Sequence, residues 1–532
     1  MNSLLIALIC LVLFGLGYIF YGRLLERLYS INEEAETPAH RKFDGVDYVP
    51  ARNWVVLFGH HFSSIAGAAP VIGPIVALSI WGWGPALLWI VLGSVFMGGV
   101  HDFGALAISV RKGGNSIANI TEEVISRKAR LFFATFVWLT LILVIAVFVY
   151  LCAKTLAFEP RIVIPSAGLV FVALVVGLLF YKTRLNQGLV TFLGLAGIVG
   201  LVFLGHKVPL EINAAQPQIV WGYILLAYAF VASITPVNIL LQPRDYLSAF
   251  LLIFGVTFGY LGILFYHPQM NMPFFSGFKW SDNALWPMLC VTIACGAISG
   301  FHSLIASGTT SKQISSEAHS KRIGYGAMLA EAIVAVLALL VVGAGLANKE
   351  ALMVILAEGG AGPIGAFGEG YGALTGAILG GFGGFLAIVV LNAFILTTLD
   401  TATRIGRYLT QELFGIKNRY LATLIVVVLS GWLGLSGNWS KIWPIFGAAN
   451  QLVAALTLLV ITAWLLSRQA NIYFTAIPCL IMLFTTVAAL AYKIPKYLGT
   501  GDFLLGIISI ALLIVAFYML VEAFGRLSGK KT

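Results

Sequence analysis

Long apolar stretches alternate with short polar connections along almost the whole chain. A helix needs ~18 or more apolar residues to cross the hydrocarbon core of a bilayer, and about fifteen stretches reach this length. The pattern therefore predicts an all-α polytopic membrane protein with about 15 transmembrane helices. The expected spans are residues 3–22, 54–80, 84–110, 131–151, 162–181, 188–205, 219–242, 247–266, 286–307, 323–346, 371–399, 420–436, 443–466, 472–492 and 503–523.

Basic residues divide unevenly between alternate connections. Of the 32 Lys and Arg residues, 24 fall on one set of alternate connections and 8 on the other. Positive residues collect on the cytoplasmic side of a membrane, so we expect the N-terminus outside and the C-terminus in the cytoplasm. With 60% hydrophobic and 10% charged residues, the chain lies far from the roughly 25% charged residues of soluble domains. Its net charge of +10 indicates topology and contact with the lipid bilayer, not nucleic acid.

Two spans carry helix-breaking residues near their middle. The second span contains Gly67, Pro70, Gly73 and Pro74, and the seventh contains residues 233–238 with a proline at 236. An unpaired backbone group in hydrocarbon costs several kcal/mol, so a helix is interrupted only where it faces protein or a wet cavity. A matched pair of interruptions in corresponding halves is typical of a transporter's binding site.

The two interrupted spans also predict an internal repeat. Spans 2–6 and 7–11 have opposite orientations, as in the five-plus-five inverted repeat of a leucine-transporter-type core. We therefore expect an extra N-terminal helix and cytoplasmic loop in residues 1–53, a first five-helix repeat in 54–206, a second in 207–405, and a C-terminal bundle in 406–532.

Ionisable side chains within the spans are few, and such residues commonly mark ion or substrate pathways. Imidazole titrates near neutrality and can take a proton on one side and release it on the other. The alternative for each histidine is a neutral packing role with one hydrogen bond to a carbonyl. The predicted proton-coupling residues are His60, His61, His101, Asp102, His302 and Asp400.

The interruptions free backbone groups next to helix ends, and a helix N-terminus suits a carboxylate. We expect a small solute with a carboxylate as substrate. Hydroxyls in span 9 that face the carbonyls freed at 66–73 would bind Na⁺, so sodium coupling stays open beside proton coupling. Asn450 and Gln451 are interpreted as interhelical hydrogen bonds outside the core. The predicted substrate-binding residues are Ser63, Ser64, Gly67, Ala68, Gly73, Ser233, Thr235, Asn238, Ser299 and Ser303.

Other chemistry finds little support in the sequence. Five cysteines occur without a C-x-x-C pair, and no two histidines have the i, i+4 spacing of a helical metal motif. We expect no bound metal and no cofactor apart from a coupling ion, H⁺ or Na⁺. Neither a paired acid nor a nucleophile elbow is present, so we expect no enzyme. A nutrient sensor that binds without transporting is the alternative, and the oligomeric state is left open.

Several stretches between about residues 53 and 455 together match a known family. They are residues 59–62 with 66–67, 70 and 73–74; 101–103; 241–246; 295–310; 324–329; 394–400 with 403–404; and 446–451. In these stretches the chain resembles the carbon starvation protein A family. The resemblance implies a transporter of the bacterial or archaeal inner membrane, used when carbon runs short. It also implies short peptides as substrates, or pyruvate taken up with protons.

Overall fold

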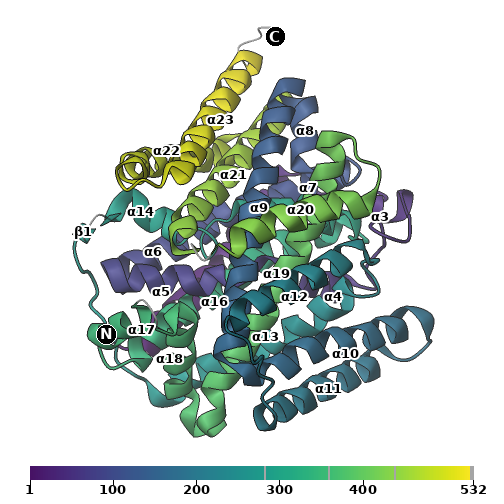
Figure 1. Ribbon diagram of the computed structural model, residues 1–532. Coiled ribbons are helices and arrows are strands. Elements are labelled where there is room, and N and C mark those ends of the chain that lie inside the picture. Colours follow the sequence, from purple (N-terminus) through teal and green to yellow (C-terminus); the bar gives the residue numbers. More distant parts are fainter. Residues whose placement is uncertain (281–282, 358–359, 437–438, 528–532) are drawn as a thin grey trace.

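The computed structural model describes residues 1–280, 283–357, 360–436 and 439–527, and helices form most of them (Figure 1). Two short strands in the described part, β1 (Lys279–Trp280) and β2 (Asn283–Ala284), pair antiparallel, with Lys279 opposite Ala284. The predicted all-α class is confirmed.

Helices follow one another closely along both halves of the chain. The first half forms α1 (Ser3–Leu16), α2 (Gly22–Leu28), α3 (Pro38–Arg41), α4 (Trp54–Ile65), α5 (Ala69–Trp81), α6 (Trp83–Gly93), α7 (Gly99–Arg111), α8 (Ile117–Val124), α9 (Arg127–Phe158), α10 (Val163–Lys182), α11 (Gln187–Lys207), α12 (Pro217–Ile234) and α13 (Leu241–Tyr266). The second half forms α14 (Leu285–Thr292), α15 (Gly300–Gly308), α16 (Gly326–Gly345), α17 (Lys349–Leu356), α18 (Gly362–Leu379), α19 (Gly383–Phe414), α20 (Arg419–Gly434), α21 (Trp439–Ser467), α22 (Tyr473–Gly499) and α23 (Phe503–Leu527).

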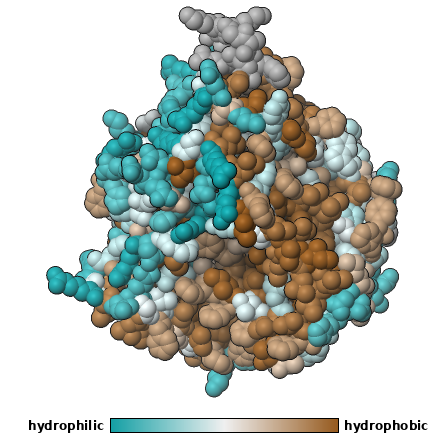
Figure 2. All heavy atoms as spheres, turned by 180° about the vertical axis from the view of Figure 1, so that it is seen from behind, coloured by the Kyte–Doolittle hydropathy of each residue, from teal (hydrophilic) through white to brown (hydrophobic). Residues whose placement is uncertain are grey.

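Helices suited to crossing a membrane dominate the described residues. Twelve are long and apolar enough when α18 and α19 are counted together, and the count becomes thirteen when the bent pair α4–α5 is one span. The other two predicted spans correspond to α14–α15 and to α20, which fall short by length, so the count of about 15 stays a prediction. Apolar side chains cover much of the face in Figure 2, and hydrophilic ones gather mainly along its left side. The multi-pass prediction is confirmed.

The interruption predicted in the second span is present. Helix α4 ends at Ile65, α5 begins at Ala69, and the two are bent by 41°. Pro70 lies in the first turn of α5, where a missing N–H costs nothing because the first N–H groups of a helix have no partner within it.

The interruption predicted in the seventh span is wrong. Residues 235–240 form a turn between two separate helices, α12 and α13, and the N–H of Val237 donates to the carbonyl of Val46 at 3.1 Å. Pro236 disfavours helix at the residue before it, so α12 stops there. The second interrupted span is residues 285–308 instead, where α14 stops at Thr292 and α15 starts at Gly300.

The two interrupted spans lie side by side and run antiparallel. His60 and His61 on α4 contact Thr309 and Thr310, just beyond the end of α15. At the other end, α5 approaches the end of α14 so closely that a Cβ on Gly73 would lie 2.6 Å from the carbonyl oxygen of Thr292. Each interruption therefore faces protein rather than lipid, as the cost of unpaired backbone requires.

The single span predicted over residues 371–399 is also wrong. Helix α18 ends at Leu379, Gly380 adopts a positive φ of 56°, and α19 starts at Gly383. Helix α18 then folds back on α19, where a Cβ on Gly384 would lie 2.8 Å from the carbonyl oxygen of Gly368. Glycine permits both the turn and the close approach.

Connections predicted to share one side of the membrane meet at one end of the bundle, which we call the Asp47 end. There Lys42 Nζ donates to the Gly113 carbonyl at 2.8 Å, and the Ala51 N–H donates to the Gln313 carbonyl at 2.9 Å. We call the opposite end the Pro268 end. There the backbone N–H groups of Ser3, Trp83 and Asn271 donate to the carbonyls of Pro268, Pro273 and Gly343, respectively.

Candidate functional site

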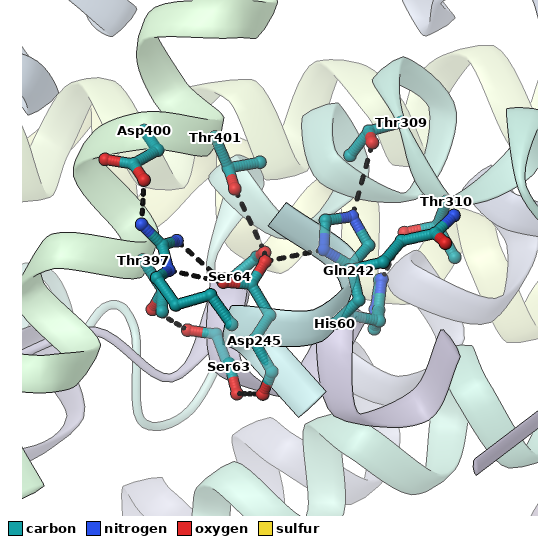
Figure 3. A network of polar contacts seen from close by, with 12 residues as sticks. His60, Ser63, Ser64, Gln242, Asp245, Thr309, Thr310, Thr397, Asp400 and Thr401 are labelled. Atoms are coloured by element: carbon teal, nitrogen blue, oxygen red, sulfur yellow. Dashed lines mark hydrogen bonds and ion pairs between the residues drawn. The ribbon is translucent and has the colours of Figure 1, made fainter. Parts of the chain in front are cut away.

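A buried charged network surrounds Asp245 near the start of α13 and lies against the first interruption (Figure 3). Asp245 Oδ2 lies 2.6 Å from His60 Nδ1, and Asp245 Oδ1 lies 2.6 Å from Arg244 Nη2. Arg244 Nη1 pairs with Asp400 on α19. The hydroxyl of Tyr228 on α12 donates to Asp400 at 2.7 Å. We call these five residues the Asp245 network.

The charges in the Asp245 network do not cancel while His60 is neutral. One guanidinium then faces two carboxylates, and His60, Arg244, Asp245 and Asp400 are all fully buried. An uncompensated buried charge is costly. The network is therefore suited to holding one proton, on His60 or on a carboxylate.

The second nitrogen of His60 faces polar side chains. Its Nε2 lies 3.3 Å from Thr309 Oγ1 and 3.2 Å from Gln313 Nε2. Gln313 in turn accepts from Gln242 Nε2 at 2.6 Å, and Tyr181 donates to Gln242. Because the Gln313 amide donates to Nε2, the proton of a neutral His60 fits Nδ1, facing Asp245.

A second buried network surrounds Asp102. Its two oxygens lie 2.6 Å from His101 Nδ1 and 2.9 Å from His302 Nδ1. On its other side, His302 Nε2 lies 2.9 Å from Glu331 Oε2 on α16, within ion-pair distance but without hydrogen-bond alignment. An imidazole with a carboxylate at each nitrogen is suited to carrying a positive charge. We call these four residues the Asp102 network.

The predicted proton-coupling residues thus fall into two groups. His60 and Asp400 belong to the Asp245 network, and His101, Asp102 and His302 belong to the Asp102 network. His61 joins neither: its Nδ1 lies 2.7 Å from Thr310 Oγ1, and its Nε2 has no hydrogen-bond partner within the described residues. The neighbours Thr309 and Thr310 therefore contact one α4 histidine each.

The first interruption is tied to α19. Thr397 Oγ1 donates to the carbonyl of Ser63 at 2.7 Å, and Thr398 Oγ1 donates to the carbonyl of Ser64 at 3.1 Å. The hydroxyl of Ser63 donates to the Asp245 carbonyl at 2.8 Å. Ser63 and Ser64 therefore lie at the Asp245 network. Gly67 lies against Thr398 and Phe148 instead, Ala68 precedes α5, and Gly73 faces α14.

The second interruption is held by α21. Asn450 Oδ1 accepts from the Phe301 N–H at 2.8 Å, and Asn450 Nδ2 donates to Ser299 Oγ at 2.9 Å. Gln451 Nε2 donates to the Cys290 carbonyl at 2.5 Å. The interhelical hydrogen bonds predicted for Asn450 and Gln451 are present, but they join the two sides of an interrupted span.

Several predicted positions do not face the first interruption. Ser303 donates to the Gly300 carbonyl at 2.7 Å and contacts Thr457 on α21, so the expectation that the span-9 hydroxyls face the carbonyls freed at 66–73 is wrong. Ser233, Thr235 and Asn238 lie at the end of α12 and in the following turn, because the seventh span is not broken at its middle.

Sequence reasoning left Arg244, Asp245 and Glu331 out of the predicted set. Arg244 and Asp245 fall in the connection between the expected spans 219–242 and 247–266, although α13 begins at Leu241 and buries both. The available signal was that these two adjacent ionisable residues lie close to Gln242 and directly before an apolar stretch. The buried position of Glu331 within a span was an equally available one.

A narrow cavity of about 20 Å³ lies between the first interruption and α18. Its lining is apolar except for Tyr371, and it includes Gly67 and Phe367. This volume holds about one water molecule. Helix α18 therefore packs closely against the first interruption and leaves almost no space between them.

Comparison with known proteins gives a consistent result. The family model of carbon starvation protein CstA matches residues 2–360 and 346–489. The peptide transporter CstA of Bacillus subtilis is 31% identical, covering 84% of this chain and 82% of its own, and that of Campylobacter jejuni is 32% identical, covering 83% and 72%. The pyruvate/proton symporter BtsT of Escherichia coli is 36% identical, covering 61% of this chain and 46% of its own.

Among solved structures, a manganese transporter of Eremococcus coleocola covers 90% of this chain and 98% of its own. Its TM-score is 0.56 at 12% identity. At that identity the likeness shows a shared fold alone. In the part of this chain that the structure describes, no group of three or more His, Cys, Asp or Glu side chains is arranged to hold a metal ion.

Proposed function

The chain belongs to the carbon starvation protein CstA family, and on that premise we propose that it is a proton-coupled secondary transporter. It imports short peptides or small carboxylates such as pyruvate during carbon starvation. The observation that carries the proposal is the Asp245 network, a buried charged cluster with an excess carboxylate that lies against an interrupted helix.

The position of the titratable groups supports proton coupling. His60 lies within 2.6 Å of Asp245 and belongs to α4, one half of the interrupted span. A proton taken up by this network neutralises it, and a movement of α4 relative to α13 separates its members. Protonation is thus linked to the relative position of the two helices, as coupling requires.

We propose a five-plus-five inverted repeat with revised boundaries. Three contacts of the first repeat have a counterpart in the second, and this packing supports the proposal. The contact of α13 with α4 corresponds to that of α21 with α15, and the contact of α12 with α9 corresponds to that of α20 with α19. Across the two repeats, the contact of α16 with α5 corresponds to that of α7 with α15. The first repeat is then α4–α7, α9, α12 and α13, and the second is α14–α16, α19, α20 and α21. The hairpin α10–α11 is an insertion, and α1–α2 and α22–α23 are additions.

The Asp47 end faces the cytoplasm in this proposal, because it carries the connections with 24 of the 32 basic residues. The N-terminus is then outside an inner membrane and the C-terminus inside. Residues 42–53 cover the cytoplasmic end, where Asp47 pairs with Arg404 at 2.8 Å. Helix α18 covers the first interruption from the opposite half. These two coverings support a state that is closed on both sides.

Uptake by the purified protein in liposomes tests the function. Labelled pyruvate and a labelled dipeptide are offered separately under an imposed inward proton gradient. We expect accumulation above equilibrium that a protonophore abolishes. Accumulation driven by a sodium gradient alone would support sodium coupling, and binding without accumulation would support a sensor.

Histidine variants connect the site with the function. His60→Ala and His302→Ala should abolish gradient-driven uptake while the protein still inserts, because each removes the imidazole that joins two helices of a buried network. His40→Ala is the matched control, since His40 is exposed on α3. Wild-type uptake in both buried-histidine variants would remove the networks from the mechanism.

A further inference from the structure

We infer that Arg244 binds the carboxylate of a small monocarboxylate substrate and that Asp400 occupies the guanidinium while the substrate is absent. This inference rests on the proposed function and deepens it, since it names the group that recognises the substrate and the group that carries the proton.

Arg244 has two carboxylate partners, and they are held differently. Asp245 Oδ1 lies 3.1 Å from Nε and 2.6 Å from Nη2 of Arg244, and Asp245 is fixed further by His60. Asp400 contacts Nη1 with Oδ2 only. Its Oδ1 is buried without a hydrogen-bond partner within the described residues. Asp400 is therefore the partner that can leave.

The unpaired oxygen also makes Asp400 the group suited to take a proton. A buried carboxylate oxygen without a donor lacks the hydrogen bonds that stabilise its charge, and protonation relieves that cost. Other titratable groups face it from the helices packed around it. Tyr228 on α12 and Arg244 on α13 contact Asp400 directly. Asp245 lies on the other side of Arg244, and His60 on α4 lies next to Asp245. The Cys152 thiol of α9 lies near Tyr228, and Arg404 lies one turn along α19.

Room for a small solute lies beside this pair. A cavity of about 200 Å³ opens between α9, α10 and α12, and it is lined by Tyr228 and by Leu396, one turn before Asp400. Ser166 is the other polar residue among its mainly apolar lining. An apolar cavity of roughly 150 Å³ binds benzene, which has six non-hydrogen atoms, so this cavity has room for the six non-hydrogen atoms of pyruvate.

The exchange conserves charge. One proton from outside binds Asp400, whose neutral carboxyl releases Arg244 Nη1. The carboxylate of the substrate then pairs with Nη1 in its place, and Asp245 keeps Nε and Nη2. On the inner side the substrate leaves, Asp400 loses its proton, and the original pair forms again. One proton and one anion cross together, so the transport is electroneutral.

Binding of labelled pyruvate to the purified protein across a pH series tests the exchange. We expect wild-type affinity to weaken by about tenfold per pH unit above the ionisation of Asp400, because binding is linked to one proton. Asp400→Asn should bind with little pH dependence. Arg244→Gln should lose about 100-fold or more in affinity, and Arg244→Lys should keep part of it. Glu122→Gln is the control, since it breaks an exposed carboxylate–arginine pair with Arg130.

Uptake by the same preparations separates the inference from the proposed function. If Asp400→Asn accumulates pyruvate to the wild-type level with the same pH dependence, the proposed exchange is wrong but the proposed transport function is not. The expected pH-linked binding without accumulation overturns transport and supports the exchange. A folded wild type that neither binds nor accumulates pyruvate overturns both. Asp400→Asn keeps the guanidinium of Arg244. This variant therefore tests the exchange even if Arg244→Gln fails to fold.

Discussion

Replacing Gly73 with alanine places a methyl group against the carbonyl oxygen of Thr292, where α5 meets the end of α14. The ideal Cβ lies 2.6 Å from that oxygen, and ordinary van der Waals contact begins at 3.4 Å. The two backbones must therefore separate by roughly 0.8 Å, the difference between these distances. A backbone carbonyl at a helix end cannot rotate aside as a flexible side chain does.

The expected cost follows from two opposing terms. Overpacking of this kind destabilises by about 1–3 kcal/mol, and removing a glycine from a helix interior returns about 0.5–1 kcal/mol. We expect a net loss of roughly 1 kcal/mol in the free energy of unfolding, within a range of about 0–2.5 kcal/mol. Uptake should fall as well, because the contact joins the two interrupted spans.

Thermal unfolding in detergent and pyruvate uptake in liposomes measure the two effects. Gly376→Ala is the matched control, because a Cβ at Gly376 on α18 meets nothing within 4 Å. That variant should be as stable as wild type or slightly more so. If Gly73→Ala were to match Gly376→Ala in both assays, the proposed contact between α5 and α14 would be refuted.

Three further substitutions have defined outcomes. Burial disfavours the Asp47 carboxylate, but Arg404, Arg407, the Tyr408 hydroxyl and Lys312 together outweigh burial and hold the pKa of Asp47 below its ordinary value. This stabilisation is full above about pH 4 and is lost as pH falls through the lowered pKa, so Asp47→Asn should flatten acid unfolding curves in that window. Asn450→Ala leaves the Phe301 N–H unpaired and should cost about 1–3 kcal/mol, read from the melting temperature. Thr398→Val orphans a buried carbonyl and should lower stability by a similar amount, whereas an unchanged melting temperature would contradict that contact.

Hydrophobic pattern predicted the helical membrane class and the two ends of the bundle, because burial in lipid constrains every span in the same way. The interruption after Ile65 was predictable for a local reason, since Pro70 and Pro74 follow Gly67. The turn at Gly380 was not, because glycines within an apolar stretch serve helix packing as readily as turns.

The second interruption shows what sequence alone misses. Residues 293–299 contain no proline, and the chain leaves the helix there because Asn450 and Gln451, more than 150 residues away, supply partners for the freed backbone groups. Pro236 gave the stronger local signal, but it ends a helix instead of interrupting one. The charged network was missed for a similar reason: Arg244 becomes a core residue only when α19 brings Asp400 to it.

Proton movement during substrate entry tests the central claim most directly. Pyruvate is added outside liposomes that hold the protein and a trapped pH indicator, with no proton gradient imposed and protein-free liposomes as the blank. The account predicts that the interior acidifies with pyruvate entry, by one proton for each carboxylate. Labelled pyruvate entering through the protein without any change in internal pH would contradict it.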